Sequence, residues 1–153
     1  MKRISERGLR LIQSFEGLRL EAYQCEAGKW TIGWGHTGPD VKPGMKINQL
    51  KADELFMNDV IRKGENVVNR LPNVDSLTQN QFDALCSLAF NAGAALSPQN
   101  SIWRCMKIKD WKGVSYMIPK WRYVTDPETK EKKVSPGLVN RRLRERELFE
   151  REC

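Results

Sequence analysis

Three residues in the first third of the chain have side chains that can take part in catalysis: Glu16, Cys25 and Thr31. A carboxylic acid can give a proton to a leaving group, and an apolar wall beside it favours the protonated form that this task needs. Phe15 and the tryptophans are candidates for such a wall. A Glu at a helix end is more often solvated than catalytic, so its surroundings must decide between the two readings.

Thr31 belongs to the segment 29–36, in which bulky residues alternate with small ones. Alternation of this kind predicts one β-strand with a bulky face and a bare face. Thr31 falls on the bare face, where neighbouring glycines would let a chain-like ligand approach. The alternative is that Thr31 is only a residue suited to strands.

The first half of the chain is predicted to position these residues with a helix, a sheet and a second helix. Apolar residues at helical spacing predict a helix over 4–15 with Ser5 as its N-cap. Glycine and proline turns across 17–45 predict a small antiparallel sheet. A long helix then starts after Asn48, and Pro72 stops it.

The second half is predicted to be mostly helical. Residues that favour helix starts precede its apolar runs: Thr78 with Gln81 three residues later, Ser101, Asp110, and Ser135 followed by Pro136. The first of these helices is expected to end at Gly93, and the last is expected to run through Phe149. The polar segment 125–133 is expected to be an exposed loop or hairpin.

This order of elements predicts an α+β fold, and 153 residues suit a single domain over 1–153. Residues 17–47 would form a small sheet lobe, and residues 1–16 and 72–153 a larger helical lobe. Residues 48–71 would form a connecting helix. We expect a cleft between the two lobes, with Glu16 facing it.

The chain is basic, with 26 Lys and Arg against 19 Asp and Glu, and this favours association with nucleic acid, anionic lipid or an acidic cell envelope. Neither a signal peptide nor a membrane-spanning stretch of about 20 apolar residues is expected. Most of the basic final helix is expected to face solvent. Arg141 and Arg142 are candidates for pinning buried carboxylates.

The cysteines do not have the spacing of a metal site. Cys25, Cys86, Cys105 and Cys153 form no CxxC pair, and His36 is the only histidine that could join them. We expect Cys86 and Cys105 to be buried thiols rather than a disulfide, and His36 to be satisfied by a carboxylate or a carbonyl. Trp103, Trp111 and Trp121 are expected in the core, although one of them could line the cleft.

Three segments, in order along the chain, resemble the phage lysozymes, the muramidase family of bacteriophage endolysins. In that family a Glu is followed after eight residues by an Asp and after five more by a Thr, and these intervals land on Glu16, Cys25 and Thr31. The segments 79–93 and 136–149 resemble two later helices of the family. The resemblance therefore covers nearly the whole chain.

The resemblance implies a lysozyme-like enzyme that hydrolyses the β-1,4 bond between N-acetylmuramic acid and N-acetylglucosamine in peptidoglycan and so releases phage. Glu16 would be the acid, and Thr31 would position water or substrate opposite it. No metal or organic cofactor, no specific nucleic acid and a monomeric state are expected. The protein would be made in the host cytoplasm and act in the periplasm or cell wall, with electrostatic contact to anionic envelope polymers.

Cys25 departs from the family pattern, because an Asp is ionised at pH 7 and an ordinary thiol is mostly neutral. Cys25 could be a thiolate nucleophile or base, a neutral thiol in a site where Glu16 and Thr31 suffice, or a redox gate. Two other functions stay open as well. A lytic transglycosylase with a lone Glu would not need an Asp at position 25, and a basic binding module would need no catalysis.

Overall fold

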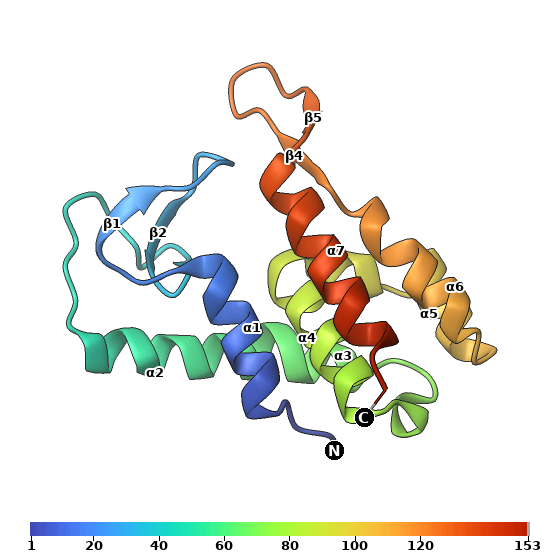
Figure 1. Cartoon of the computed structure of the whole chain (residues 1–153). Coiled ribbons are helices and arrows are strands. Elements are labelled where there is room, and N and C mark those ends of the chain that lie inside the picture. Colours follow the sequence, from blue (N-terminus) through green and yellow to red (C-terminus); the bar gives the residue numbers. More distant parts are fainter. Residues whose placement is uncertain (153) are drawn as a thin grey trace.

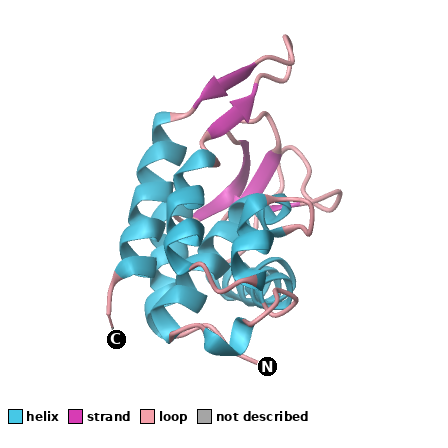
Figure 2. Cartoon of the chain, turned by 90° about the vertical axis from the view of Figure 1, so that its right-hand side faces the viewer, coloured by secondary structure: helices cyan, strands magenta, loops and turns pink. Residues whose placement is uncertain are grey.

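The computed structural model describes residues 1–152, and they form a small antiparallel sheet beside a larger group of helices (Figure 1). The sheet and the group of helices are joined by a long helical segment that begins with α2 (Gln49–Asp59). The N-terminus and the end of the last helix, α7 (Pro136–Glu150), lie opposite the hairpin formed by β4 (Tyr123–Thr125) and β5 (Lys132–Val134) (Figure 2). The α+β class is therefore confirmed.

Helix α1 (Glu6–Glu16) is held firmly at its start. Ser5 caps it by accepting a hydrogen bond from the Gly8 amide, as predicted, and the Ser5 amide donates to the buried carboxylate of Asp83 at 2.9 Å. Gly17 ends the helix with φ +65°, a conformation that glycine adopts readily. This short helix therefore holds Glu16, its last residue, at a defined position.

The sheet contains β1 (Arg19–Gln24), β2 (Trp30–Gly33) and β3 (His36–Thr37), in that order. Thr31 lies opposite Tyr23 on one side and Thr37 on the other. The prediction of a single strand over 29–36 was wrong, because the chain reverses direction at residues 34–35. Gly33, just before the turn, and Gly35, within it, have positive φ angles that permit the reversal.

The connecting segment starts as predicted, with the Asn48 side chain accepting from the Lys51 amide. It is not a uniform α-helix, since a π-helical stretch, η1 (Val60–Glu65), separates α2 from α3 (Asn66–Val68). Such stretches are rare and often occur at functional sites. The π-helical stretch places Arg62 and Lys63 on the wall of a cleft.

Helix α4 (Gln79–Ala92) forms the centre of the helical part. Thr78 and Gln81 form the predicted capping box, and ten of the fourteen helix residues are buried. Helix α7 (Pro136–Glu150) packs along α4, and Ser135 caps it by accepting from the Leu138 amide. Helix α1 also packs against α4, so Glu16 and the final helix are brought to the same region.

Short elements complete the helical part. They are η2 (Val74–Ser76), η3 (Gly93–Leu96), α5 (Ser101–Lys107), α6 (Trp111–Met117), η4 (Ile118–Lys120), β4 (Tyr123–Thr125) and β5 (Lys132–Val134). Asp110 caps α6 as predicted, but the N-cap of α5 is Asn100 rather than Ser101. The Ser101 prediction failed because Ser101 already lies in the first helical turn. The polar segment 125–133 falls in the β4–β5 hairpin, as expected.

Most of the cysteine and tryptophan side chains that were predicted to be buried are at least partly buried. Cys25, Cys86 and Cys105 are free thiols; Cys86 is buried, whereas Cys105 is only partly buried, and Cys153 lies outside the described residues. Burial raises the pKa of the Cys86 and Cys105 thiols. The three late tryptophans pack on the core as expected.

Across residues 1–152, no helix has the length and apolar character needed to cross a membrane.

Candidate active site

A cleft of about 530 Å³ lies where the sheet, the π-helical stretch and the end of α4 meet. Glu16, Cys25 and Thr31, the three residues singled out from the sequence, all line it. Its other lining residues are Tyr23, Ala27, Lys29, Gly35, Thr37, Arg62, Lys63, Val67, Ala89, Phe90, Asn91 and Gly93. The structure therefore brings together residues that lie on three separate segments.

Glu16 is only 17% exposed, and one of its carboxylate oxygens, Oε1, accepts a hydrogen bond from Nη1 of Arg141 at 2.6 Å. The neighbour that the structure shows for this carboxylate is therefore a guanidinium, where the sequence led us to expect an apolar wall. The Phe15 ring lies against the same guanidinium, with the Arg141 Cζ atom 4.7 Å from the ring centre.

The other oxygen of Glu16, Oε2, lies against Gly35. A Cβ atom at position 35 would overlap Oε2, and the φ angle of Gly35 is +76°. Only glycine meets both conditions, the close approach and the positive φ. The sequence predicts only that Gly35 belongs to the bare face of a strand. The alternation of large and small residues gives no sign of its contact with Glu16.

Thr31 is 3% exposed, and its hydroxyl donates to the Lys29 carbonyl at 3.0 Å. A hydroxyl that donates one hydrogen bond can still accept others. Its oxygen therefore remains a possible acceptor for a water or sugar hydroxyl.

Cys25 follows β1 in the turn toward β2. Its amide donates to the Lys29 carbonyl at 2.9 Å, and its carbonyl accepts from the Gly28 amide at 2.8 Å. The turn is thus fixed by backbone hydrogen bonds, while the thiol is partly exposed to the cleft.

Tyr23 is a cleft residue that sequence reasoning did not select. Burial, and after it the negative charge of Glu16, raises the pKa of Tyr23 above its ordinary value. The Arg19 guanidinium covers its ring, with Cζ 4.3 Å from the ring centre. The available signal was its place in the segment between Glu16 and Thr31 that carries the family resemblance.

His36 is held between two carboxylates, Asp59 at 2.7 Å from Nδ1 and Asp40 at 2.9 Å from Nε2. This confirms the expectation that carboxylates satisfy His36. The hydrogen bond from His36 lowers the pKa of Asp40. Within residues 1–152, no group of three His, Cys, Asp or Glu side chains could hold a metal ion.

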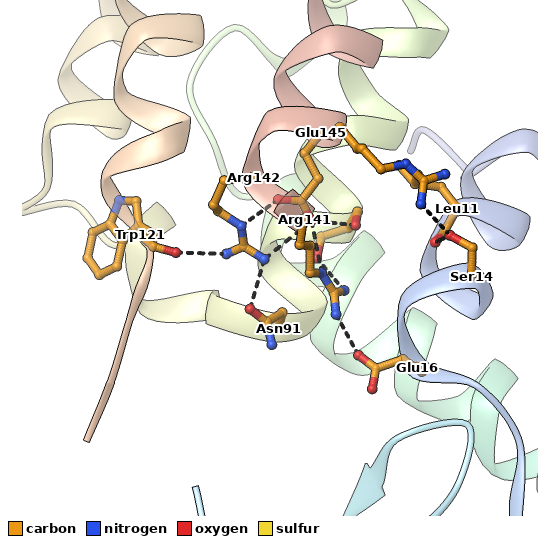
Figure 3. Close-up of polar contacts among 10 residues, drawn as sticks. Leu11, Ser14, Glu16, Asn91, Trp121, Arg141, Arg142 and Glu145 are labelled. Atoms are coloured by element: carbon orange, nitrogen blue, oxygen red, sulfur yellow. Dashed lines mark hydrogen bonds and ion pairs between the residues drawn. The ribbon is translucent and has the colours of Figure 1, made fainter. Parts of the chain in front are cut away.

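The final helix contributes more than a solvated face. Glu145 is fully buried, contrary to expectation, and Arg141 and Arg142 both contact it, at 3.2 and 2.8 Å from their Nε atoms (Figure 3). The expectation that Arg141 and Arg142 pin buried carboxylates is thereby confirmed. Arg142 also donates to the Asn91 side chain at 2.8 Å, and Asn91 lines the cleft.

A second cavity of about 770 Å³ shares Ala27, Lys29 and Asn91 with the cleft, so the two are adjacent. Trp121 lines this second cavity, whereas none of the three late tryptophans lines the cleft itself. Its charged lining residues are four lysines and one carboxylate: Lys29, Lys120, Lys130, Lys132 and Asp126. An elongated ligand could extend from one cavity into the other.

A carboxylate in a cleft between a small antiparallel sheet and a helical part is the arrangement of a lysozyme-like α+β enzyme. The "Phage lysozyme" family profile matches residues 13–145. The chain is 41% identical over 148 residues to "Endolysin" of Acyrthosiphon pisum secondary endosymbiont phage 1, a match that covers 96% of this chain and 97% of that protein. The chain belongs to the phage lysozyme family.

Solved structures agree with this assignment. The "Muramidase domain of SpmX from Asticaccaulis excentricus" has a TM-score of 0.80 and 34% identity, covering 99% of this chain and all of that chain. A crystal structure of a point mutant of P22 lysozyme has a TM-score of 0.73 and 36% identity, covering 97% of this chain and 99% of that chain. The chain spans about half the length of curated endolysins from Bacillus phages B103 and PZA (53% and 54%).

Proposed function

We propose that this chain, a lysozyme of the endolysin type, hydrolyses the β-1,4 bond between N-acetylmuramic acid and N-acetylglucosamine in peptidoglycan, with Glu16 as the general acid. The observation that carries the proposal is the position of Glu16 in the cleft, with Oε1 held by Arg141 and Oε2 lying against Gly35. The endolysin and muramidase names of the relatives support the substrate.

The two oxygens of Glu16 then have separate tasks. Oε2 carries the proton to the departing sugar oxygen, while Arg141 holds Oε1 and fixes the direction of the group. Proton donation leaves a carboxylate, and the adjacent guanidinium stabilises that charge. Thr31 accepts a hydrogen bond from the attacking water or from a sugar hydroxyl on the opposite wall.

Cys25 acts in this proposal as a neutral thiol on the cleft wall, not as an obligatory nucleophile. Its partial exposure and its place in a turn fixed by backbone hydrogen bonds support a contact with the sugar. The charge that an Asp would provide is absent, so Glu16 and Thr31 carry the reaction.

The same proposal covers the organisation of the chain. Residues 17–47 act as the small lobe, residues 1–16 and 72–153 as the helical lobe, and residues 48–71 as the connection. The protein works as a monomer, is made in the host cytoplasm and reaches the wall at lysis, when phage is released. The net charge of +7 supports contact with anionic envelope polymers.

The test compares Glu16→Gln with wild type in a peptidoglycan turbidity assay. Loss of the acid should lower the initial rate by about 10²–10⁴-fold, with unchanged thermal unfolding. Glu21→Gln, an exposed carboxylate on β1, is the matched control and should keep the wild-type rate. A Glu16→Gln variant that keeps more than about a third of the activity would contradict the assignment.

Mass spectrometry of the digest separates hydrolysis from transglycosylation. Hydrolysis leaves reducing ends, whereas a transglycosylase leaves anhydro ends. A digest dominated by anhydro ends would overturn the hydrolase proposal and keep Glu16 as its acid. Unchanged glycan strands would point to the binding module.

A further inference from the structure

Glu145 is a charged residue that the core would not need for stability alone. Its carboxylate is fully buried between α7 and α4 and receives hydrogen bonds from Arg141 and from the Ser87 hydroxyl. A buried ion pair can often be replaced by apolar side chains without loss of stability, because the charges must give up their water. A buried charge at this position therefore calls for another explanation.

The contacts of Arg141 provide one. Its guanidinium is fixed on three sides: Nε donates to Glu145 at 3.2 Å, Nη2 to the Ser87 carbonyl at 3.2 Å, and Nη1 to Glu16 at 2.6 Å (Figure 3). A guanidinium is planar, so a fixed Nε edge also sets the direction of the Nη1 donor. Glu145 is therefore one of two buried groups that hold this guanidinium, and the Ser87 carbonyl is the other.

Arg142 extends the same arrangement toward the second cavity. It faces Glu145 at 2.8 Å, donates to the Asn91 side chain at 2.8 Å, and reaches the Trp121 carbonyl at 3.5 Å. Burial lowers the pKa of Arg142 to about 10, and the charge of Glu145 opposes that shift. One buried carboxylate therefore contacts both arginines that reach the cleft residues Glu16 and Asn91.

We propose that Glu145 is a positioning residue for glycan cleavage: it fixes the Glu16 carboxyl group through Arg141 and the Asn91 side chain through Arg142. The inference rests on the proposed role of Glu16 as the acid. Glu145 lies behind the two arginines and touches no substrate. Its effect must therefore appear as a loss of geometry at the acid rather than as a loss of binding.

The test measures kcat and KM of Glu145→Gln on soluble peptidoglycan fragments. Misplacement of a reacting group can cost about 10²-fold, so we expect kcat to fall by about 10- to 100-fold while KM changes by less than about threefold. Glu150→Gln is the matched control, because Glu150 lies on the same helix and also contacts a serine and an arginine, but away from the cleft. It should keep the wild-type kcat.

A spectroscopic measurement reports on Arg141 directly. With ¹⁵N-labelled arginine, the Nε–H signal of Arg141, assigned by its loss in Arg141→Met, should exchange slowly with water in wild type and in Glu150→Gln. It should exchange rapidly in Glu145→Gln, because its acceptor has been weakened. Wild-type exchange in a folded Glu145→Gln variant would overturn the inference.

A second variant guards against simple misfolding. Arg142→Met combined with Glu145→Met replaces the buried pair with apolar side chains, which such sites often tolerate. A folded double variant with a reduced kcat supports positioning, and one with the wild-type kcat shows that Glu145 is only structural. If Glu16→Gln kept its activity, the proposed function itself would be refuted. If Glu16→Gln were inactive but Glu145→Gln kept the wild-type kcat, only the positioning role of Glu145 would be refuted.

Discussion

The two walls of the cleft are held in place by different forces. On the helical wall, Glu16 forms an ion pair with Arg141, and Arg141 forms a second ion pair with the buried Glu145. On the sheet wall, Thr31 and Cys25 are positioned by backbone hydrogen bonds in strands and turns. The helical wall therefore depends on charge, and the sheet wall depends on shape.

This difference follows from the task of each wall. A group that donates a proton must point in one direction, and hydrogen bonds to charged groups are stronger and more directional than neutral ones. A wall that receives a sugar chain must leave room, and glycine-rich turns provide it. Changes of charge should damage the helical wall, and changes of volume should damage the sheet wall.

Apart from removal of the acid itself, the largest effect is expected at Gly35, where the two walls touch. In Gly35→Ala the new methyl group would overlap Oε2 of Glu16, so the acid must move. We expect the turbidity rate to fall by about 100-fold or more, since misplacement of about 1 Å can cost 10²-fold. The variant should also lose more than about 1 kcal/mol of unfolding free energy from its positive φ.

Gly44→Ala separates the clash from the backbone strain. Gly44 has φ +81° and no atom within 4 Å of an added Cβ, so this control shares the strain without touching Glu16. It should lose stability and keep its activity. Equal activity losses in the two variants would show that the contact between the walls has no role.

The next largest effect is expected for Arg141→Met, which tests whether the helical wall depends on charge. Methionine keeps much of the side-chain volume but removes the hydrogen bond to Glu16 at 2.6 Å and leaves Glu145 with one arginine fewer. We expect a fall of about 10- to 100-fold in the initial rate. Arg146→Met, an exposed change on the same helix, should have no effect.

Much of this arrangement follows from the sequence, and the exceptions have physical causes. Caps at Ser5, Asn48 and Thr78 were predictable because their hydrogen bonds join residues close in the chain. The contact of Glu16 with Arg141 spans 125 positions, and no local pattern reports it. Glu16 could be predicted from its place in the motif. That Arg141 is its neighbour could not, because this contact depends on how α1 and α7 pack on α4.

The turn at residues 34–35 was missed for a related reason. Alternating large and small residues suit a strand, and they equally suit a reversal when the small residues are glycines with positive φ. The burial of Glu145 was missed because charges on a helix usually face solvent. In both cases the deciding interaction is tertiary.

A smaller effect is expected on the sheet wall for Thr31→Val, which keeps the shape and removes the hydroxyl. Activity should fall by about 5- to 20-fold, the size expected for one hydrogen bond to a reacting group, and stability should change by about 1 kcal/mol or less because only the bond to Lys29 is lost. Thr31→Ser should restore most of the rate. Wild-type activity in Thr31→Val would mean that Thr31 serves only the strand.

The smallest effect of a single substitution is expected at Cys25. Its thiol is partly exposed on the sheet wall, and the turn around it is fixed by backbone atoms, so Cys25→Ser should leave the geometry intact. We expect Cys25→Ser to keep measurable lysis, within about threefold of wild type, since neutral hydrogen bonds contribute little. Cys25→Asp should be at least as active as wild type, because it restores the ionised group of the family pattern.

Activity should depend more on the size of the side chain at position 25 than on its ability to ionise. Alkylation of Cys25 would place a large group on the cleft wall beside Thr31 and Tyr23, and it should inhibit by blocking the sugar chain. Cys86→Ala combined with Cys105→Ala removes the other two thiols placed in the structure, and Cys25→Ser serves as the unreactive control. An obligatory thiolate predicts the reverse order, with an inactive serine variant and wild-type activity that rises with pH as a thiol ionises. That result would move part of the chemistry from the charged helical wall to the sheet wall, and the division between the two walls would no longer hold.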